Sequence, residues 1–270
     1  MNSRETILLC GAGRMGQALL KGWLAGGVAP ASIIILEPAA EPELLALAHE
    51  TGVALNPAAI SDRPSTIVLA VKPQVMDEAV PQIAPHCGPD TVIISVAAGR
   101  TMASIACHLP PETAIVRAMP NTPAAIGRGI AALVANPYAT PGHRALCERL
   151  LRAAGDVVWL DAEEQMDAVT AVSGSGPAYV FLLAECLAAA ARNAGLPAET
   201  AERLARATVS GAGELLHRSG QDAAKLRQDV TSPGGTTAAA LAVLMREPGL
   251  AGLLDEAVAA AVRRSRELSR

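Results

Sequence analysis

The chain has 270 residues, of which 51% are hydrophobic and 18% charged, with a formal net charge of −4. This composition supports a substantial core in one large or two ordinary domains and argues against disorder. Because Lys and Arg are scattered and form no basic stripe, nucleic acid is not expected as a partner. Charges interrupt the apolar stretches and no signal peptide is evident, so neither a membrane span nor export is expected.

The five cysteines are scattered, with no CxxC pair and no metal-ligand spacing. Such a set is typical of reduced thiols that fill core space in an intracellular protein, which favours a cytoplasmic location. Neither the cysteines nor the five histidines predict a metal site. No Ser–His or Cys–His arrangement for nucleophilic catalysis is visible from the sequence.

The first predicted strand, residues 6–10, leads into Gly11-Ala12-Gly13-Arg14-Met15-Gly16 and then into an apolar-periodic helix. In a dinucleotide site the first glycine permits a tight turn, the second lets the backbone approach a pyrophosphate, and the third lets helix and strand pack closely. The phosphates bind free N–H groups at the helix N-terminus. We therefore predict a dinucleotide site here, in preference to a plain strand–turn–helix connection.

Strands and helices alternate over the first 160 residues. Further strands are predicted at residues 33–37, 66–71, 91–96, 114–117, 130–135 and 156–160. Helices are predicted at residues 18–25, 43–50, 75–83, 102–107 and 142–154. This alternation predicts an α/β fold in which right-handed crossovers join the strands of a parallel sheet.

From about residue 163 only helices are predicted, at residues 163–172, 178–193, 198–218, 223–229, 236–246 and 250–268. The sequence thus predicts a Rossmann dinucleotide-binding domain over residues 1–161 and an all-α domain over residues 162–270. Residues 178–191 are apolar on nearly all helix faces, with Glu185 as the only charge. A helical module of this size has too little volume to bury such a helix alone. A subunit interface is therefore preferred over a central core helix.

Ligands of an open parallel sheet bind at the carboxyl ends of the strands. Glu37 follows the second strand, about 20 residues after Gly16, where a carboxylate accepts hydrogen bonds from ribose hydroxyls and repels a 2′-phosphate. No Lys or Arg follows before Arg63, so the local sequence favours NADH over NADPH. The alternative is a solvated carboxylate. Lys72 and Asn121 follow later strands. Lys72 either contacts the cofactor or a substrate carboxylate, or is simply solvated. The side-chain amide of Asn121 either binds the nicotinamide carboxamide or braces its own loop.

Two glycine-rich loops precede helices in the second part, at residues 173–177 and 231–237. Each offers backbone N–H groups and hydroxyls at a helix N-terminus, which is a ready anion site. Capping alone needs a single Ser or Thr. The additional glycines therefore favour a ligand site, especially in the second loop.

Taken together, five motifs resemble the Δ1-pyrroline-5-carboxylate reductase family in order and spacing: residues 11–16, 71–74, 119–123, 173–179 and 232–237. The resemblance extends from about residue 5 to the last helix. It implies a Rossmann domain followed by a helical dimerisation domain. It also implies reduction of the cyclic imine pyrroline-5-carboxylate to proline with NAD(P)H, the last step of proline biosynthesis. Members form homodimers, often joined into decamers, with the active site between subunits.

The resemblance also implies roles for individual residues. Residues 11–16 hold the pyrophosphate, and the cofactor is lined by Val71, Lys72, Pro73, Ala97, Ala98, Asn121 and Pro123. The substrate carboxylate is held by Ser232, Gly234, Gly235 and Thr236, Thr237 bonds the ring nitrogen, and Ser175 with Gly176 forms the facing wall. The family more often uses NADPH, whereas Glu37 favours NADH, so either cofactor remains open.

Two alternatives belong to other classes. β-Hydroxyacid dehydrogenases resemble this chain in domain order, but they place a lysine where Val180 stands, four residues after Gly176. Without that acid–base group an alcohol–ketone reaction loses about 10²–10⁴ in rate, whereas an imine arrives protonated from water and needs only orientation and a neutral hydrogen bond. A non-catalytic dinucleotide sensor would bind cofactor without turnover, but it leaves residues 232–237 unexplained.

Overall fold

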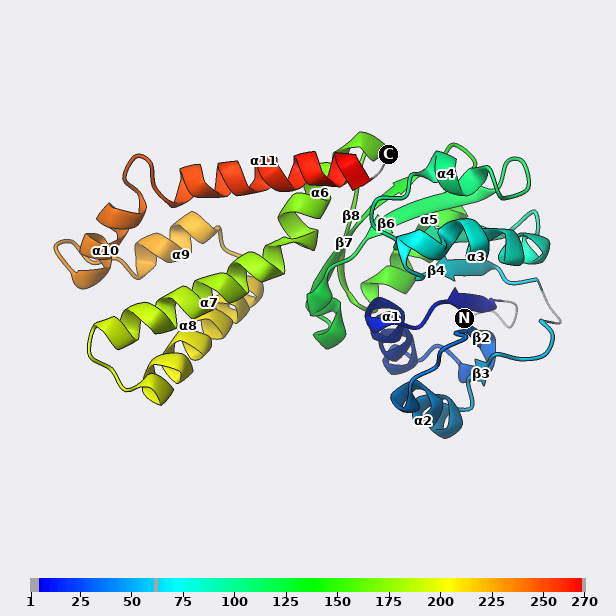
Figure 1. The fold of residues 1–270 in the computed structure, drawn as a ribbon, viewed down its shortest axis with the longest axis horizontal. Coiled ribbons are helices and arrows are strands. Elements are labelled where there is room, and N and C mark those ends of the chain that lie inside the picture. Colours follow the sequence, from blue (N-terminus) through cyan, green and yellow to red (C-terminus); the bar gives the residue numbers. More distant parts are fainter. Residues whose placement is uncertain (1–4, 61–62, 269–270) are drawn as a thin grey trace. The chain divides into compact units, whose positions relative to one another are not determined.

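The computed structural model describes residues 5–60 and 63–268. The chain divides into two compact units, one comprising residues up to Gly174 together with the end of the chain from Val262, the other comprising Ser175–Ala261 (Figure 1). The first unit thus includes a segment beyond Asp161, where the composition changes. It also includes the last turns of the final helix.

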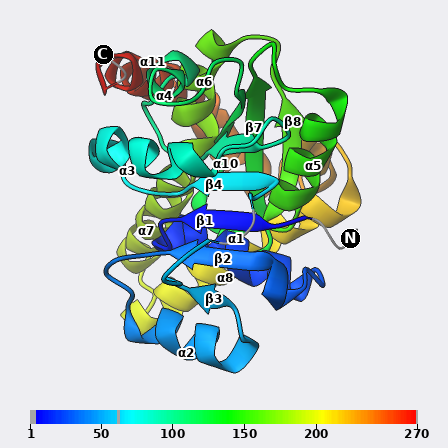
Figure 2. The same ribbon diagram turned by 90° about the vertical axis from the view of Figure 1, so that its right-hand side faces the viewer.

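The first unit is built on an eight-stranded sheet in the order β3-β2-β1-β4-β5-β6-β7-β8. Figure 2 shows β3, β2, β1 and β4 following one another in this order. The strands are β1 (Ile7–Cys10), β2 (Ile33–Leu36), β3 (Ala54–Leu55), β4 (Thr66–Leu69), β5 (Val92–Ser95), β6 (Ala114–Met119), β7 (Gly129–Ala135) and β8 (Gly155–Trp159). The first six strands are parallel and follow the order of doubly wound dinucleotide-binding folds. The order reverses between β1 and β4, so the loops after these two strands flank the expected ligand crevice.

Helices cover both faces of this sheet because successive strand residues point to opposite sides and both sets are apolar. Ile7 and Leu9 pack in one buried cluster with residues of α1 (Arg14–Ala25), α2 (Pro42–Thr51) and α5 (Pro141–Arg152). Leu8 and Cys10 pack in the other with residues of α3 (Met76–Ile83) and α4 (Met102–Ala106). The buried Trp23 joins two helices, since its Nε1 donates to the Leu150 carbonyl at 2.8 Å.

The sheet departs from the predicted parallel pairing at one place. β7 pairs with β6 in antiparallel orientation, with Val116 opposite Ala135. The connection between them, residues 120–128, contains only the 3₁₀ helix η4 (Thr122–Ile126). A parallel crossover needs a dozen or more residues, so this connection permits only a reversal of direction. Strand β3 was not predicted either, because its two residues are too few to show a periodic pattern.

The helix predicted over residues 163–172 is present, but its pitch changes along its length. The segment consists of the 3₁₀ helix η5 (Glu163–Gln165), the short α6 (Met166–Val169) and the π turn η6 (Thr170–Gly174). The Thr170 hydroxyl donates to the Met166 carbonyl at 2.8 Å, and the Ser173 hydroxyl to the Val169 carbonyl at 3.1 Å. These side chains compete for the carbonyls that a regular α-helix would use, which favours a local change of pitch.

The second unit contains α7 (Gly176–Asn193), α8 (Ala198–Ser219), α9 (Ala223–Asp229), α10 (Thr236–Leu244) and most of α11 (Leu250–Leu268). Helices α7 and α8 lie side by side (Figure 1), and their buried residues are the small Ala188, Ala201 and Ala205. The large apolar side chains of α7 face outward: Phe181 is 62% and Leu182 57% exposed.

One helical segment, Glu163–Asn193, is long and apolar enough to cross a membrane by length and composition, although only 6% of its most apolar window is buried. This differs from the expectation that charges break every apolar stretch too early. A helix whose apolar side chains are covered by a second subunit passes the same test. The membrane test alone is therefore weak evidence for a span.

Candidate functional site

The glycine loop (residues 11–16) has the geometry that a dinucleotide site requires. Gly11 has φ +87°, and a Cβ there would lie 2.7 Å from the Ala70 carbonyl oxygen. A Cβ on Gly16 would lie 2.4 Å from the Gly11 carbonyl oxygen, so only glycine lets α1 begin this close to the loop. At Gly13 a Cβ would meet nothing within 4 Å. The loop is therefore crowded toward the protein and open toward a ligand.

The N-terminus of α1 is suited to an anion. Gly13 is its N-cap, and among the described residues no side chain caps the helix and no acid lies in its first turn. The Gln17 side chain donates to the Ala12 carbonyl at 3.0 Å and braces the loop. The first N–H groups of the helix and its dipole therefore favour a phosphate.

An open cleft of about 770 Å³ lies along this helix start, within the usual range for cofactor sites. It is lined by Ala12, Gly13, Arg14, Met15, Gln17, Ala18, Lys21, Glu37, Ala39, Glu41, Glu43, Lys72, Thr122 and Ala125. The structure thus brings together the glycine loop, Glu37 and Lys72, which the sequence predicted as cofactor ligands. The shape and the free helix N-terminus fit a dinucleotide.

The side chain of Glu37 lies against the glycine loop. Its Oε2 accepts the Ala12 N–H at 2.8 Å, and its Oε1 accepts the Ala39 N–H at 3.1 Å. Of the cations that line the cleft, Lys21 is paired with Glu43 at 2.7 Å. The cleft lining thus combines the carboxylates Glu37, Glu41 and Glu43 with the cations Arg14, Lys21 and Lys72. A preference of Glu37 for ribose hydroxyls over a 2′-phosphate stays a prediction.

The other predicted cofactor residues lie in loops at the carboxyl edge of the sheet, outside the lining of this cleft: Val71, Pro73, Ala97, Ala98, Asn121 and Pro123. Ala97 is buried and Ala98 exposed. The Asn121 side-chain oxygen accepts the Ile130 N–H at 2.9 Å. Of the two roles considered for Asn121, the structure contains the contact that braces the loop. Binding of the nicotinamide amide stays a prediction.

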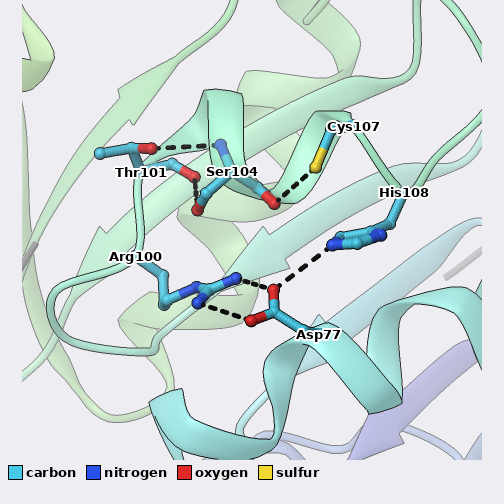
Figure 3. Close-up of polar contacts among 6 residues, drawn as sticks. All are labelled: Asp77, Arg100, Thr101, Ser104, Cys107 and His108. Carbon is cyan, nitrogen blue, oxygen red and sulfur yellow. Dashed lines mark hydrogen bonds and ion pairs between the residues drawn. The ribbon is translucent and has the colours of Figure 1, made fainter. Parts of the chain in front are cut away.

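A polar cluster missed by the sequence analysis ties one of these loops to helix α3 (Figure 3). The Arg100 guanidinium, just after Gly99, binds both carboxylate oxygens of Asp77 in the first turn of α3. His108 Nε2 lies 3.3 Å from the same carboxylate. The hydrogen bond from Arg100 is the main reason that the pKa of Asp77 is lowered. The cluster therefore joins the start of α3 to the loop after β5.

A second missed contact lies at the end of β6. Arg117 is only 5% exposed, and its Nη1 donates to Glu163 Oε1 at 2.9 Å. The same oxygen accepts the Met102 N–H at the start of α4, at 2.8 Å. An arginine inside a predicted buried strand was the available signal, since such a charge is almost always paired. The sequence does not say which carboxylate is its partner.

The predicted substrate residues lie in the second unit. Gly235 is the N-cap of α10, and no side-chain cap is present within the described part of the chain. Gly234 has φ +70°, and a Cβ on Gly235 would lie 2.5 Å from the Ser232 hydroxyl oxygen. Thr237 is half-buried in the first turn of α10. The turn thus exposes N–H groups and hydroxyls that suit a carboxylate.

The remaining predicted residues, Ser175 and Gly176, form the start of α7. Ser175 is the N-cap but makes no capping hydrogen bond with its side chain. A Cβ on Gly176 would meet nothing within 4 Å. This helix start therefore leaves room beside its backbone. Across the described residues, no group of three or more His, Cys, Asp or Glu side chains could hold a metal ion.

Comparison with known proteins relates both parts of the chain to known families. Residues 163–268 match the family model for pyrroline-5-carboxylate reductase dimerisation, and residues 6–99 match the model for NADP oxidoreductase, coenzyme F420-dependent. The chain is 40% identical over 270 residues to a pyrroline-5-carboxylate reductase of Pseudomonas aeruginosa, covering 99% of this chain and 98% of that protein. It is 40% identical to that of Synechocystis, with 97% of each chain covered.

Solved structures agree with the sequence comparison. A pyrroline-5-carboxylate reductase from Coxiella burnetii has a TM-score of 0.90 at 36% identity, covering 99% of this chain and 100% of that one. The Plasmodium falciparum pyrroline carboxylate reductase, solved with NADP bound, has a TM-score of 0.79 at 26% identity, with 98% of each chain covered. The predicted fold class, a Rossmann domain followed by a helical dimerisation domain, is confirmed. With identity at this level over nearly the full length, the chain belongs to the pyrroline-5-carboxylate reductase family.

Proposed function

We propose that this chain reduces 1-pyrroline-5-carboxylate to L-proline with NADPH or NADH, in the last step of proline biosynthesis. The observation that carries the proposal is the uncapped start of α10, where N–H groups and hydroxyls suit a carboxylate, in a chain that also has a dinucleotide cleft. When bound, the reduced nicotinamide supplies a hydride. The hydride adds to the carbon of the protonated C=N bond, and the electron pair of that bond passes to nitrogen to give the secondary amine.

The proposed roles of the residues follow the chemistry of their positions. The glycine loop holds the pyrophosphate at the start of α1, and Glu37 accepts hydrogen bonds from the ribose, which favours NADH. The carboxyl-edge loops line the rest of the cofactor, through Val71, Lys72, Pro73, Ala97, Ala98, Asn121 and Pro123. The substrate carboxylate binds the start of α10 through Ser232, Gly234, Gly235 and Thr236, and Ser175 with Gly176 forms the opposite wall.

Thr237 is the proposed catalytic residue. Its hydroxyl hydrogen-bonds the ring nitrogen and orients the imine. A neutral hydroxyl suits this role because a cationic lysine beside an iminium would repel it. No side chain needs to donate a proton, since the imine nitrogen takes its proton from water.

The test is an assay of NADH and NADPH oxidation with pyrroline-5-carboxylate. Thr237→Ala should lower kcat/KM for the imine by about tenfold, the value of one hydrogen bond, and leave the Kd of the dinucleotide unchanged. Thr237→Ser is the control, because it keeps the hydroxyl and should retain most activity. Binding of dinucleotide without any turnover by the wild type would instead favour a dinucleotide sensor.

The proposal includes assembly through the C-terminal part of the chain, residues 162–270, as a homodimer that can join into a decamer. It is supported by the match to a dimerisation model from residue 163 and by the exposed apolar side chains of α7. The partners are then a small imino acid and further copies of the chain, not nucleic acid or a membrane.

The proposal also places the chain in the cytoplasm. The five free cysteines are in keeping with that reducing compartment.

A further inference from the structure

Asn56 stands directly after β3 and extends the pairing of that strand with β2. Its N–H donates to the Ile35 carbonyl at 2.8 Å. Its side chain then makes two contacts with one peptide position: Oδ1 accepts the Glu37 N–H at 2.8 Å, and Nδ2 donates to the Glu37 carbonyl at 2.8 Å. A carboxamide has the same donor and acceptor as a peptide group. The Asn56 side chain thus makes the hydrogen bonds to β2 that the backbone of a further β3 residue would otherwise make.

The backbone of Asn56 is suited to this role. Its φ is +46°, in the left-handed region that asparagine tolerates better than most residues. The strand ends here, because the following residue is Pro57, which has no N–H to donate to a sheet. The side-chain amide therefore provides hydrogen bonds that the backbone of β3 no longer offers.

The consequence concerns Glu37. β2 ends at Leu36, so the main chain of Glu37 lies beyond the strand, where loops usually move. Asn56 holds that main chain on both its polar groups, while the Glu37 carboxylate accepts N–H groups from Ala12 and Ala39. The carboxylate is thus fixed against the glycine loop before a ligand binds, which lowers the entropic cost of recognition.

We propose that Asn56 is a positioning residue for cofactor selection, which holds the Glu37 carboxylate where the adenosine ribose binds. The inference rests on the proposed role of Glu37 in the dinucleotide site. A fixed carboxylate discriminates against a 2′-phosphate because it cannot rotate away into solvent. Once the Asn56 amide is removed, the Glu37 main chain can shift, so the ribose loses an ordered acceptor and a phosphate meets less repulsion.

The test compares the dissociation constants of NADH and NADPH by calorimetry, with no imine present. Asn56→Gly removes both amide contacts and keeps the left-handed backbone accessible. It should raise the Kd of NADH about fivefold to tenfold and leave the Kd of NADPH unchanged or lower. The turnover number at saturating NADH should not change. An equal loss of affinity for both cofactors would mean a merely structural role and would overturn the proposal.

Asn136 provides a matched control. It stands directly after β7, its Oδ1 accepts the Ile115 N–H at 3.1 Å, and its Nδ2 donates to the Thr113 carbonyl at 2.9 Å. These contacts lie at the start of β6, at the opposite end of the strand from the cofactor loops. Asn136→Gly should lower the thermal midpoint while the ratio of the two dissociation constants stays that of the wild type. A comparable change in that ratio would contradict a specific role for Asn56.

Two further variants complete the test. In a Glu37→Ser background, Asn56→Gly should change the ratio of dissociation constants no further, because its effect passes through Glu37. If the effects of the two substitutions on that ratio add in full, the proposal is overturned. Asn56→Asp keeps the acceptor for the Glu37 N–H but sets a carboxylate oxygen against the Glu37 carbonyl, so the Kd of NADH should rise even if the glycine variant folds poorly. Normal dinucleotide binding without imine turnover would refute the proposed function and leave this inference standing.

Discussion

At the scale of single residues, we expect the charge of Glu37 to decide between the ribose hydroxyls of NADH and the 2′-phosphate of NADPH. Its carboxylate lies against the glycine loop through the Ala12 N–H at 2.8 Å. We expect Glu37→Ser to raise the ratio of kcat/KM for NADPH to that for NADH about tenfold, because one ion–ion repulsion of roughly 1–2 kcal/mol disappears. Glu50→Ser is the control, since Glu50 is exposed on α2 and does not line the cleft. An unchanged ratio would exclude a ribose contact.

Substitutions at Gly13 and Gly16 should have different effects, one on dinucleotide affinity and the other on the stability of the fold. Gly13→Ala puts its Cβ into space with no protein atom within 4 Å. It should raise the Kd of either dinucleotide about tenfold or more, while the free energy of unfolding falls by no more than about 1 kcal/mol, the usual cost of alanine at an N-cap. Gly16→Ala places a Cβ 2.4 Å from a carbonyl oxygen and should cost about 1–3 kcal/mol of stability. Urea denaturation and calorimetry measure the two effects. A loss of stability in Gly13→Ala with unchanged dinucleotide affinity would contradict a pyrophosphate site at this loop.

The glycine loop could be predicted from the sequence because each of its glycines meets a local requirement of the backbone. Glu37 could be predicted because it stands at a fixed distance along the chain from that loop. The contacts of Asn56 with Glu37 and of Arg117 with Glu163 join residues far apart in the chain. No local pattern encodes such pairs, so these positioning residues became visible only in the folded chain.

At the scale of elements, the Asp77–Arg100 pair connects the start of α3 with the loop that leads to α4. The pKa of Asp77 is lowered in the folded chain, mainly by the hydrogen bond from Arg100. Stabilisation by this carboxylate is therefore present above its unfolded pKa, near 3.8, and is lost as the pH falls through the lower folded value. We expect Asp77→Asn to lower the thermal midpoint at pH 7, with a difference from wild type that narrows as the pH approaches 3. A difference of constant size would mean that ionisation of Asp77 plays no part.

Element prediction succeeded where periodicity or breaking residues were strong. The helices of the second unit begin and end within two residues of their predicted bounds, because Gly195-Leu196-Pro197 and Glu247-Pro248-Gly249 cannot continue a helix. It failed where the deciding interaction was not periodic. The reversed direction of β7 depends on the short connection from β6, and the change of pitch near Thr170 depends on side-chain hydroxyls.

At the scale of the whole molecule, the second unit leaves apolar surface that its own residues do not cover. On α7, Val180, Phe181, Leu182 and Leu183 are 47%, 62%, 57% and 53% exposed. The sequence predicted an interface here because the helix is apolar on nearly every face. Which surface a partner covers depends on the partner, so the expected homodimer and decamer follow from the family resemblance and not from the residues of one chain.

A single charge tests whether that surface is an interface. Phe181→Glu should raise the dissociation constant of the assembly about thirtyfold or more, as expected for a buried aromatic contact, and light scattering at micromolar concentration should then detect monomer. Leu45→Glu is the matched control: Leu45 is 52% exposed on α2, outside residues 162–270, and its variant should keep the wild-type mass. Circular dichroism checks that both variants keep their helices. If Phe181→Glu keeps the wild-type mass but loses binding to lipid vesicles, the apolar face of α7 contacts a membrane and the proposed assembly through this helix is wrong.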